Sequence, residues 1–438
     1  MRVAMIGAGY VGLVSAACFS EFGFTVTCVD SDPERIAALS AGQVPIYEPG
    51  LEPLLAANVA AGRLSFTDEF AAAVPAADVV MLAVGTPSRR GDGHADLTFV
   101  HEAARQVADA LDGYTVVATK STVPVGTGRE IARIIRAQRP DTAFDVVSNP
   151  EFLREGSALG DFMRPDRVVV GVESEQAQAV MQALYRPLFL IETPVLFTTL
   201  ETAELTKYAA NCFLATKITF INEIADLCER LDADVQDVAK GIGLDGRIGR
   251  YFLHAGPGFG GSCFPKDTAA FARIAEEADA PSAIVEAVLR KNTARKAAMV
   301  DKIVQACGGS IAGKTVAVLG VTFKPNTDDV RESPSLVIVP GLMAQGATVR
   351  AFDPAGMAEA GRVLDGVIWC RDSYDAMAGA DALVILTEWN EFRALDLNRA
   401  QDLLETPLIV DLRNIYDPAE VAAAGFRYVS VGRPASSP

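Results

Sequence analysis

A cysteine in the segment GPGFGGSCFPKD, residues 256–267, is the residue of this chain best suited to covalent chemistry. Cys263 follows three closely spaced glycines, and Lys266 and Asp267 come shortly after it. Glycines allow a backbone to approach a ligand closely, and a neighbouring lysine lowers the pKa of a thiol. The other cysteines lie in helical or strand patterns, where a small apolar filler is expected. The residues therefore favour a nucleophilic Cys263, with a filler cysteine as the alternative.

Two pairs of polar residues have the i, i+4 spacing that places side chains on one face of a helix. Lys207 and Asn211 lie in a long helical pattern, and such a pair can stabilise an oxyanion. The alternative is a lysine whose stem lies along the helix beside a polar surface residue. Glu151 and Glu155 follow a strand end in NPEFLREG. If they form a helical turn, one carboxylate can have a raised pKa and carry protons, and a solvated acidic turn is the alternative.

The first 32 residues follow the pattern of a dinucleotide-binding βαβ unit. A β-rich run leads into Gly7-x-Gly9-x-x-Gly12, whose glycines permit a tight turn, the approach of a pyrophosphate and close packing of helix on strand. Asp30 ends the second strand, where a carboxylate holds the adenosine ribose and disfavours a 2′-phosphate. We therefore predict NAD rather than NADP, and a Rossmann-like domain without a cofactor is the alternative.

Four further residues follow predicted strands at the edge where such sheets hold ligands. They are Thr86 in VGTP, Thr122 in KSTVPVGT, and Lys324 and Arg331 in VTFKPNTDDVRESP. Each threonine is also compatible with a cap or turn. Two cations suit a phosphorylated ligand, with solvated surface charge as the alternative. The C-terminal region lacks the three-glycine loop, so we do not expect it to hold a second dinucleotide in the usual way.

The order of elements predicts an α/β chain with two Rossmann-like, doubly wound domains joined by a long central helix and a helical middle domain. Strands are expected at RVAMI, FTVTCVD, DVVMLAV, TVVATK and FDVVS, and again at TVAVLG, ATVRAFDP, ALVILT and LIVDLRN. Residues 201–232 contain neither glycine nor proline and predict one long helix. We place the domains at residues 1–198, 199–308 and 309–438, and expect the tail GRPASSP to be disordered.

Composition argues against several classes of protein. The 438 residues carry a formal charge of −17, which disfavours binding to nucleic acid or to an anionic membrane. Seven scattered cysteines without a CxxC pair indicate neither a disulfide framework nor a metal site, and reduced thiols suit the cytoplasm. We expect neither a signal peptide nor a membrane span, because no apolar run approaches the ~20 residues that a span needs.

Assembled in order, the motifs resemble those of the UDP-glucose/GDP-mannose dehydrogenase family over nearly the whole chain. They are GAGYVG, KSTVPVGT, NPEFLREG, LTKYAANCFLATKITFINE, GPGFGGSCFPKD and GVTFKPNTDDVRESP. The resemblance implies a four-electron oxidation of UDP-glucose at C6 to UDP-glucuronate, with two NAD⁺ consumed. It also implies a homodimer formed through the middle region. It places the family's nucleophile on Cys263, which would carry first a thiohemiacetal and then a thioester.

The resemblance also assigns the other sites. It implies catalytic roles for Lys207 and Asn211 at the oxyanion, for Asp267 at the hydrolytic water, and for Thr122 and Glu151 in proton transfer and hydrolysis. Contacts to NAD are implied for Gly7, Gly9, Tyr10, Val11, Gly12, Asp30, Arg35, Thr86, Thr122, Glu155, Lys266 and Arg331. Contacts to the sugar nucleotide are implied for Glu151, Phe152, Leu153, Arg154, Glu155, Lys207, Asn211, Phe252, Leu253, His254, Ala255, Gly256, Gly260, Phe323 and Lys324.

Other functions compete with this interpretation. Within the family, GDP-mannose and UDP-N-acetylhexosamines are alternative substrates. A single-step NAD dehydrogenase of the hydroxyacid type would use Lys207 and Asn211, need no cysteine and form one NADH per turnover. A catalytically inactive, NAD-binding regulator is the third class, and the intact set of Cys263, Lys207 and Asp267 argues against it.

Overall fold

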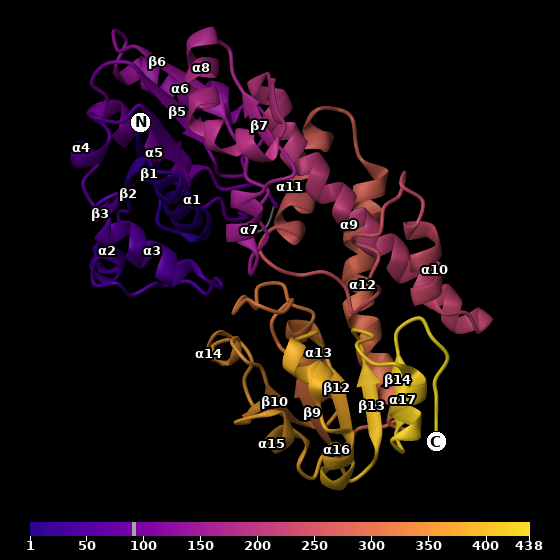
Figure 1. The fold of residues 1–438 in the computed structure, drawn as a ribbon. Coiled ribbons are helices and arrows are strands. Elements are labelled where there is room, and N and C mark those ends of the chain that lie inside the picture. Colours follow the sequence, from indigo (N-terminus) through magenta and orange to yellow (C-terminus); the bar gives the residue numbers. More distant parts are fainter. Residues whose placement is uncertain (90–92) are drawn as a thin grey trace. The chain divides into compact units, whose positions relative to one another are not determined.

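The computed structural model describes residues 1–89 and 93–438, and the chain divides into two compact units (Figure 1). The first unit comprises Met1–Ala210 and Arg273–Asp279, and the second comprises Asn211–Ala272 and Ala280–Pro438. Each unit contains one sheet with helices on both faces, so the predicted α/β class with two Rossmann-like sheets is confirmed. Within the described residues, no helix has both the length and the hydropathy needed to cross a membrane.

The first unit is built on an eight-stranded sheet of order β3-β2-β1-β4-β5-β6-β7-β8. The expected strands are β1 (Arg2–Ile6), β2 (Thr25–Val29), β4 (Val79–Leu82), β5 (Thr115–Thr119) and β6 (Phe144–Ser148). Three strands that we did not predict complete it, namely β3 (Leu64–Thr67), β7 (Val168–Gly171) and β8 (Val195–Thr198). Neighbouring strands run parallel, except that β6 meets β7 in an antiparallel pairing. Each added strand has four residues, too few to show a clear period.

Helices cover both faces of this sheet. They are α1 (Tyr10–Glu21), α2 (Pro33–Ser40), α3 (Leu51–Ala60), α4 (Phe70–Ala73), α5 (Thr98–Ala110), α6 (Thr127–Gln138), α7 (Ala158–Met163), α8 (Glu175–Tyr185) and the 3₁₀ helix η1 (Arg186–Ile191). One core packs around Phe19 and Phe162, and the other around Val100 and Ile131. The start of α2 follows from its sequence, because Asp32 caps the backbone N–H groups of the first turn and Pro33 occupies the first position.

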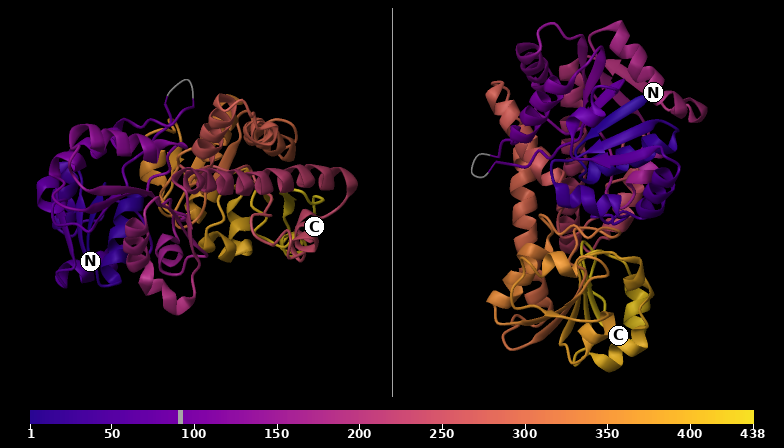
Figure 2. Two further views of the ribbon diagram at one scale, coloured as in Figure 1. Left: turned by 90° about the horizontal axis from the view of Figure 1, so that it is seen from above. Right: turned by 90° about the vertical axis from the view of Figure 1, so that its left-hand side faces the viewer.

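The middle of the chain is helical, as predicted. It contains α9 (Leu200–Leu231), α10 (Val235–Gly243), α11 (Phe264–Glu277) and α12 (Ala283–Ala306). Figure 2 shows α9 and α12 as long, unbroken helices. The 32 residues of α9 continue without interruption because they contain neither of the two residues that break helices, glycine and proline.

The second unit ends in a six-stranded parallel sheet of order β11-β10-β9-β12-β13-β14. Its strands are β9 (Thr315–Leu319), β10 (Thr348–Phe352), β11 (Ile368–Trp369), β12 (Ala382–Ile385), β13 (Leu408–Asp411) and β14 (Arg427–Ser430). Its helices are α13 (Ser335–Ala344), α14 (Met357–Ala360), α15 (Ser373–Met377), η2 (Asn390–Ala394), α16 (Leu397–Leu403) and α17 (Pro418–Ala423). They lie on both faces of the sheet (Figure 2).

The C-terminal tail is ordered, and the prediction of disorder was wrong. The Arg433 side chain is buried and donates hydrogen bonds to the Ser430 hydroxyl at 3.0 Å, the Tyr416 carbonyl at 3.2 Å and the Tyr428 hydroxyl at 2.8 Å. Ser436 forms an isolated antiparallel bridge with Tyr428. A buried guanidinium with three acceptors outweighs the polar, proline-containing composition of the tail.

Candidate active site

The predicted cofactor loop connects β1 to α1, and the surroundings of its three glycines differ. A Cβ at Gly12 would lie 1.8 Å from the carbonyl oxygen of Gly7, so only glycine fits there. Gly7 has φ +106°, and a Cβ on it would lie 2.7 Å from the Ala83 carbonyl oxygen. A Cβ at Gly9 would meet nothing within 4 Å. The open space is thus at the N-terminus of α1, where a helix binds a phosphate, and this geometry fits NAD.

Asp30 lies at the end of β2, where the ribose-binding carboxylate was predicted. It is buried and accepts hydrogen bonds from the Ala8 amide at 2.7 Å and from Arg35 Nη1 at 3.1 Å. Its second oxygen accepts the Asp32 amide at 3.0 Å. The carboxylate therefore joins the glycine loop to α2 and is fixed in place before any ligand binds.

The two predicted threonines lie together after β4 and β5. The Thr86 hydroxyl donates to the Thr122 carbonyl at 2.9 Å. Ser121, one residue earlier, donates to the Val84 carbonyl at 2.6 Å. Thr86 therefore links the two loops that follow β4 and β5, as a turn residue would. Its contact with NAD stays a prediction.

Glu151 and Lys207 form a buried ion pair in the first unit. Lys207 Nζ lies 3.0 Å from Glu151 Oε1, and both side chains are at most 5% exposed. The Phe152 ring is close to two cations, with its centroid 5.3 Å from Lys207 Nζ and 3.6 Å from the Arg167 guanidinium. The pair brings the NPEFLREG segment and α9 together, so two of the predicted catalytic side chains are in contact.

Glu151 and Glu155 do not form the helical turn that would place both carboxylates on one face. Residues 151–154 have no regular structure, and a turn begins only at Glu155. The Glu151 carboxylate accepts the Leu153 amide at 2.5 Å, a local bond that competes with helix formation. Arg154, predicted to contact the sugar nucleotide, pairs with Asp161 and is largely exposed.

A buried lysine close to this pair was missed by the sequence reasoning. Lys120 Nζ lies 3.3 Å from the Tyr185 hydroxyl and 3.5 Å from Asn149 Oδ1. Burial lowers the pKa of Lys120 to about 8, with a further lowering by Lys207 opposed by Glu151. The available signal was its position in KSTVPVGT, directly after a buried strand.

In the second unit, Cys263 directly precedes α11. The Asp267 amide donates to the Cys263 carbonyl at 2.8 Å, which closes the first helical turn. Cys263 is partly exposed, whereas the other six cysteines are buried. A thiol at a helix N-terminus is in the position where the helix dipole favours the thiolate.

The Asp267 side chain is buried and doubly bonded. Asn211 Nδ2 donates to Asp267 Oδ2 at 2.6 Å, and Lys266 Nζ lies 2.6 Å from Oδ1. Asn211 comes from α9 and the other two residues from the first turn of α11, so this contact fixes the cysteine-bearing turn to the long helix. An amide, a carboxylate and a thiol are thereby gathered in one part of the second unit.

Two glycines of the cysteine loop are required by packing rather than by ligand access. A Cβ at Gly260 would lie 2.3 Å from the Glu332 carbonyl oxygen. Gly261 has φ +84°, and a Cβ on it would lie 2.8 Å from the Phe323 ring. The Gly261 amide donates to the Arg331 carbonyl at 2.8 Å. The segment 323–333 fills the space beside both glycines, so packing alone requires glycine there, and the contact of Gly260 with the sugar nucleotide stays a prediction.

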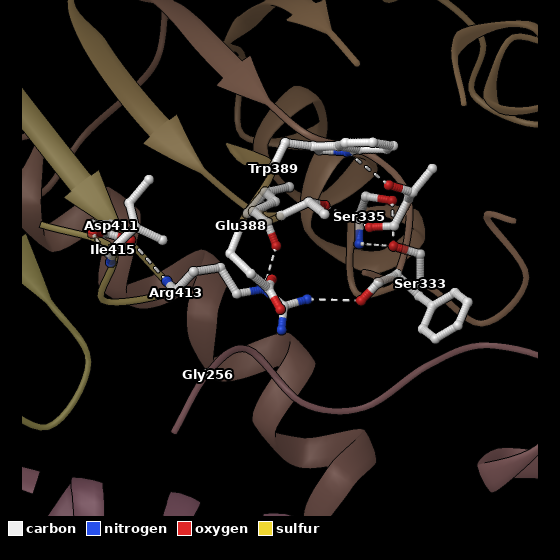
Figure 3. A network of polar contacts seen from close by, with 12 residues as sticks. Gly256, Ser333, Ser335, Glu388, Trp389, Asp411, Arg413 and Ile415 are labelled. Atoms are coloured by element: carbon white, nitrogen blue, oxygen red, sulfur yellow. Dashed lines mark hydrogen bonds and ion pairs between the residues drawn. The ribbon is translucent and has the colours of Figure 1, made fainter. Parts of the chain in front are cut away.

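This segment also contains predicted ligand residues, and Arg413 holds its start. Arg413 Nη2 donates to the Phe323 carbonyl at 2.9 Å, and Nε donates to the Leu386 carbonyl at 2.6 Å and lies 3.1 Å from Glu388 Oε2 (Figure 3). Lys324 Nζ lies 5.3 Å from the centre of the Phe323 ring. The sequence reasoning did not select Arg413, whose only signal is its place just after β13.

The stretch predicted to contact the sugar nucleotide, residues 252–256, is anchored at its end. The Gly256 amide donates to Asn222 Oδ1 at 2.8 Å, and its carbonyl accepts from Arg295 Nε at 3.0 Å. His254 is exposed, whereas Leu253 and Ala255 are buried. Phe252 has φ +63°, a strained value for a bulky residue.

The predicted site residues are thus divided between the units. The first contains Gly7, Gly9, Tyr10, Val11, Gly12, Asp30, Arg35, Thr86, Thr122, Glu151, Phe152, Leu153, Arg154, Glu155 and Lys207. The second contains Asn211, Phe252, Leu253, His254, Ala255, Gly256, Gly260, Cys263, Lys266, Asp267, Phe323, Lys324 and Arg331.

Three models of one protein family match this chain. They are the UDP-glucose/GDP-mannose dehydrogenase family NAD binding domain at residues 1–189, its central domain at 201–294 and its UDP binding domain at 317–418. The chain is 60% identical to a UDP-glucose 6-dehydrogenase of Rhizobium meliloti (strain 1021), over 99% of this chain and 100% of that protein. It is 50% identical to UDP-glucose 6-dehydrogenase TuaD of Bacillus subtilis (strain 168), over 99% and 94% of the two chains.

Solved structures agree with these matches. A UDP-glucose dehydrogenase from Pyrobaculum islandicum superposes with a TM-score of 0.88 at 41% identity, over 94% of each chain. A UDP-D-ManNAc dehydrogenase from Pyrococcus horikoshii gives a TM-score of 0.86 at 28% identity, over 99% of each chain.

Proposed function

This chain belongs to the UDP-glucose/GDP-mannose dehydrogenase family, and we propose that it oxidises the C6 alcohol of UDP-glucose to the carboxylate of UDP-glucuronate. The observation that carries the proposal is the turn in which Cys263 precedes α11 and Asp267 is bonded to Asn211. The 60% identity to a UDP-glucose 6-dehydrogenase over the whole chain supports UDP-glucose over the other nucleotide sugars.

The family is one of NAD-dependent oxidoreductases, and the first unit has the residues to hold the dinucleotide. The open space at Gly9 suits the pyrophosphate, and Asp30 suits the adenosine ribose. The resemblance adds proposed contacts from Arg35, Thr86, Thr122 and Glu155, and also from Lys266 and Arg331, which belong to the second unit. Bound NAD⁺ supplies the oxidising power by accepting one hydride in each of two steps.

In the first oxidation the C6 alcohol loses its hydroxyl proton and a hydride and becomes an aldehyde. Lys207, a cation, and Asn211, an amide donor, are the proposed partners of the oxygen as negative charge develops on it. Glu151 holds the Lys207 ammonium in its buried position, because the ion pair is 3.0 Å long and both side chains are shielded from solvent.

In the second oxidation the Cys263 thiolate attacks the aldehyde carbon and forms a C–S bond, and the oxygen takes a proton to give a thiohemiacetal. Loss of a hydride and of the hydroxyl proton converts it into a thioester. Water then attacks the carbonyl, the C–S bond breaks, and the thiolate leaves. Asp267 is the proposed acceptor of the water's proton, with Thr122 and Glu151 assisting. Each sugar therefore yields one carboxylate, two NADH and three protons.

Assembly, domain division and location form the finer part of the proposal. On α9, Phe213, Phe220 and Leu227 are each at least 50% exposed and recur every seven residues, which makes one apolar stripe. Such a stripe supports a homodimer formed through this helix.

We also propose the domains 1–198, 199–308 and 309–438 and a cytoplasmic location, on the grounds given by the sequence.

The deciding experiment measures how many NADH molecules form per UDP-glucose consumed, in the wild type and in Cys263→Ser. We expect two NADH per sugar, with turnover collapsing in the variant, and Cys228→Ala, which removes a buried cysteine, as the matched control. One NADH per sugar would instead indicate the single-step class. Turnover with GDP-mannose or UDP-N-acetylhexosamines but not with UDP-glucose would move the substrate within the family.

A further inference from the structure

The carboxylate of Glu48 is buried in the first unit and is not one of the proposed catalytic or binding residues. Glu48 is only 7% exposed. It lies in the sequence Glu48-Pro49-Gly50-Leu51, just before α3. The Leu51 amide donates to the Glu48 carbonyl at 3.1 Å, and Gly50 has φ +84°. Proline followed by a glycine of positive φ forms a type II turn, so the backbone that bears this carboxylate is rigid.

Three donors converge on this one carboxylate. Oε1 accepts the Ala158 amide at 2.8 Å, and Oε2 accepts the Gly156 amide at 2.6 Å. Oε2 also accepts a short hydrogen bond from the Tyr10 hydroxyl. Burial and the Glu48 carboxylate hold the pKa of Tyr10 above its usual range, so the phenol keeps its proton and remains a donor. Both oxygens are therefore used, although no basic side chain pairs with them in the described part of the chain.

These donors come from the two segments of the first unit that matter most for its ligands. Tyr10 is the first residue of α1 and follows Gly9, which faces the open space proposed for the pyrophosphate. Gly156 and Ala158 directly follow Phe152–Glu155, the stretch proposed to contact the sugar nucleotide. The Gly156 amide lies within 3.2 Å of the Tyr10 hydroxyl as well. A single carboxylate thus fastens the start of the cofactor helix to the sugar segment.

We propose that Glu48 is a positioning residue that fixes the segment 151–158 against the start of α1, and so sets the position of the sugar relative to the nicotinamide cofactor. This inference rests on the proposed function. Hydride transfer depends steeply on the placement of the reacting atoms, so a small displacement of either segment reduces the rate of chemistry more than it reduces binding.

The test compares Glu48→Gln with Glu52→Gln, whose side chain is exposed on the neighbouring helix. Glutamine keeps the size of the side chain, but it has one acceptor oxygen where the carboxylate has two. Its NH2 group cannot accept a hydrogen bond, so either the Ala158 amide or the Gly156 amide and the Tyr10 hydroxyl lose their acceptor. Hydrogen exchange measured by mass spectrometry reports on residues 151–163 in the protein without ligands. Initial rates with UDP-glucose and with UDP-glucose deuterated at C6 give kcat, KM and the kinetic isotope effect.

We expect exchange in residues 151–163 to accelerate about tenfold in Glu48→Gln and to stay unchanged in Glu52→Gln. We expect kcat to fall about 10- to 100-fold with smaller changes in KM, and the isotope effect to rise because hydride transfer becomes more rate-limiting. In a Tyr10→Phe background the same substitution should have a smaller effect on kcat, with Tyr47→Phe, an exposed tyrosine, as control.

Two results would overturn the proposal. Unchanged exchange in residues 151–163 would show that Glu48 does not hold the segment, whatever the activity. Faster exchange with unchanged kcat and isotope effect would show that it only stabilises the loop. If the wild type itself fails to oxidise UDP-glucose, the proposed function fails, and the exchange measurement still decides whether Glu48 fixes the segment.

Discussion

The Asn211 amide donates a 2.6 Å hydrogen bond to Asp267, and the other oxygen of that carboxylate lies 2.6 Å from the Lys266 ammonium. Asp267 is 1% exposed, so these two groups replace the water that a carboxylate would otherwise bind. A charged group that is buried and doubly bonded has a fixed position, four residues after Cys263, which is compatible with the role proposed for Asp267 in thioester hydrolysis.

Replacing Asp267 with asparagine should slow hydrolysis of the thioester. We expect kcat for Asp267→Asn to fall about 10²- to 10³-fold, because a general base contributes on this scale. The covalent intermediate should then accumulate and appear as an added UDP-sugar mass on the intact protein after mixing with UDP-glucose and NAD⁺. Asp301→Asn, at an exposed position on α12, is the control. Loss of activity without any adduct would assign Asp267 to an earlier step.

The buried pair of Lys207 and Glu151 should behave as a unit in stability. We expect Lys207→Met to lower the free energy of unfolding by about 3–5 kcal/mol, because it leaves a buried carboxylate without its cation. Adding Glu151→Gln should recover part of the loss. Chemical denaturation of the four proteins in the cycle measures the coupling, and additivity within about 0.5 kcal/mol would contradict it.

Two glycines of the cofactor loop should respond differently to alanine. Gly12→Ala should destabilise the protein, because its methyl group would lie 1.8 Å from the Gly7 carbonyl oxygen. Gly9→Ala should leave the thermal midpoint unchanged but weaken NADH binding at least about tenfold, or 1.4 kcal/mol, by occupying the space proposed for the pyrophosphate. Calorimetric titration with NADH measures the affinity. Wild-type affinity in Gly9→Ala would place the pyrophosphate elsewhere.

One cysteine should react with iodoacetamide in the folded protein. Burial raises the pKa of the thiols of Cys18, Cys28, Cys212, Cys228, Cys307 and Cys370. Cys263 alone among the seven is partly exposed, so we expect alkylation there and inactivation in proportion. Peptide mass spectrometry identifies the site. Equal labelling of a second cysteine before activity is lost would contradict this assignment.

Lys120 should make stability depend on pH. Its pKa is lowered to about 8 in the folded protein from 10.5, so between these pH values the unfolded chain binds more protons. Stability therefore rises with pH in this window, and below pH 8 both states are protonated. Relative to Lys120→Met, the free energy of unfolding of the wild type should rise by roughly 3 kcal/mol between pH 8 and 10.5. Urea denaturation across this range measures the difference, and parallel curves would refute it.

Much of the fold followed from local patterns. The nine strands expected from apolar runs are all present, and the unbroken helix that carries Lys207 and Asn211 was evident from the absence of glycine and proline. Asp267 and Cys263 were selected as candidate site residues because the cysteine lies in a short, unusual segment. In each of these cases the physical cause lies within a few residues of sequence, where spacing alone carries the information.

The features that were missed depend on partners far away in the sequence. Glu48 acts through an amide 110 residues later, and Arg413 through a carbonyl 90 residues earlier. Lys120 differs from an ordinary surface lysine only because Asn149 and Tyr185 enclose it. The prediction of a disordered tail was wrong, and the helical turn considered at Glu151 is absent, for a related reason. In both, a specific side chain determined the conformation against the local composition: Glu151 accepts a backbone amide, and Arg433 donates to three acceptors.

The close packing of the cysteine loop against the segment 323–333 has a consequence for the history of the chain. Gly260 and Gly261 leave no space for a side chain, because the Glu332 backbone and the Phe323 ring already fill it. A larger residue at either glycine would be tolerated only if the facing segment shifted or shrank with it. Among descendants of a common ancestor, substitutions in these two stretches should therefore appear together or not at all, although about sixty residues separate Gly261 from Phe323.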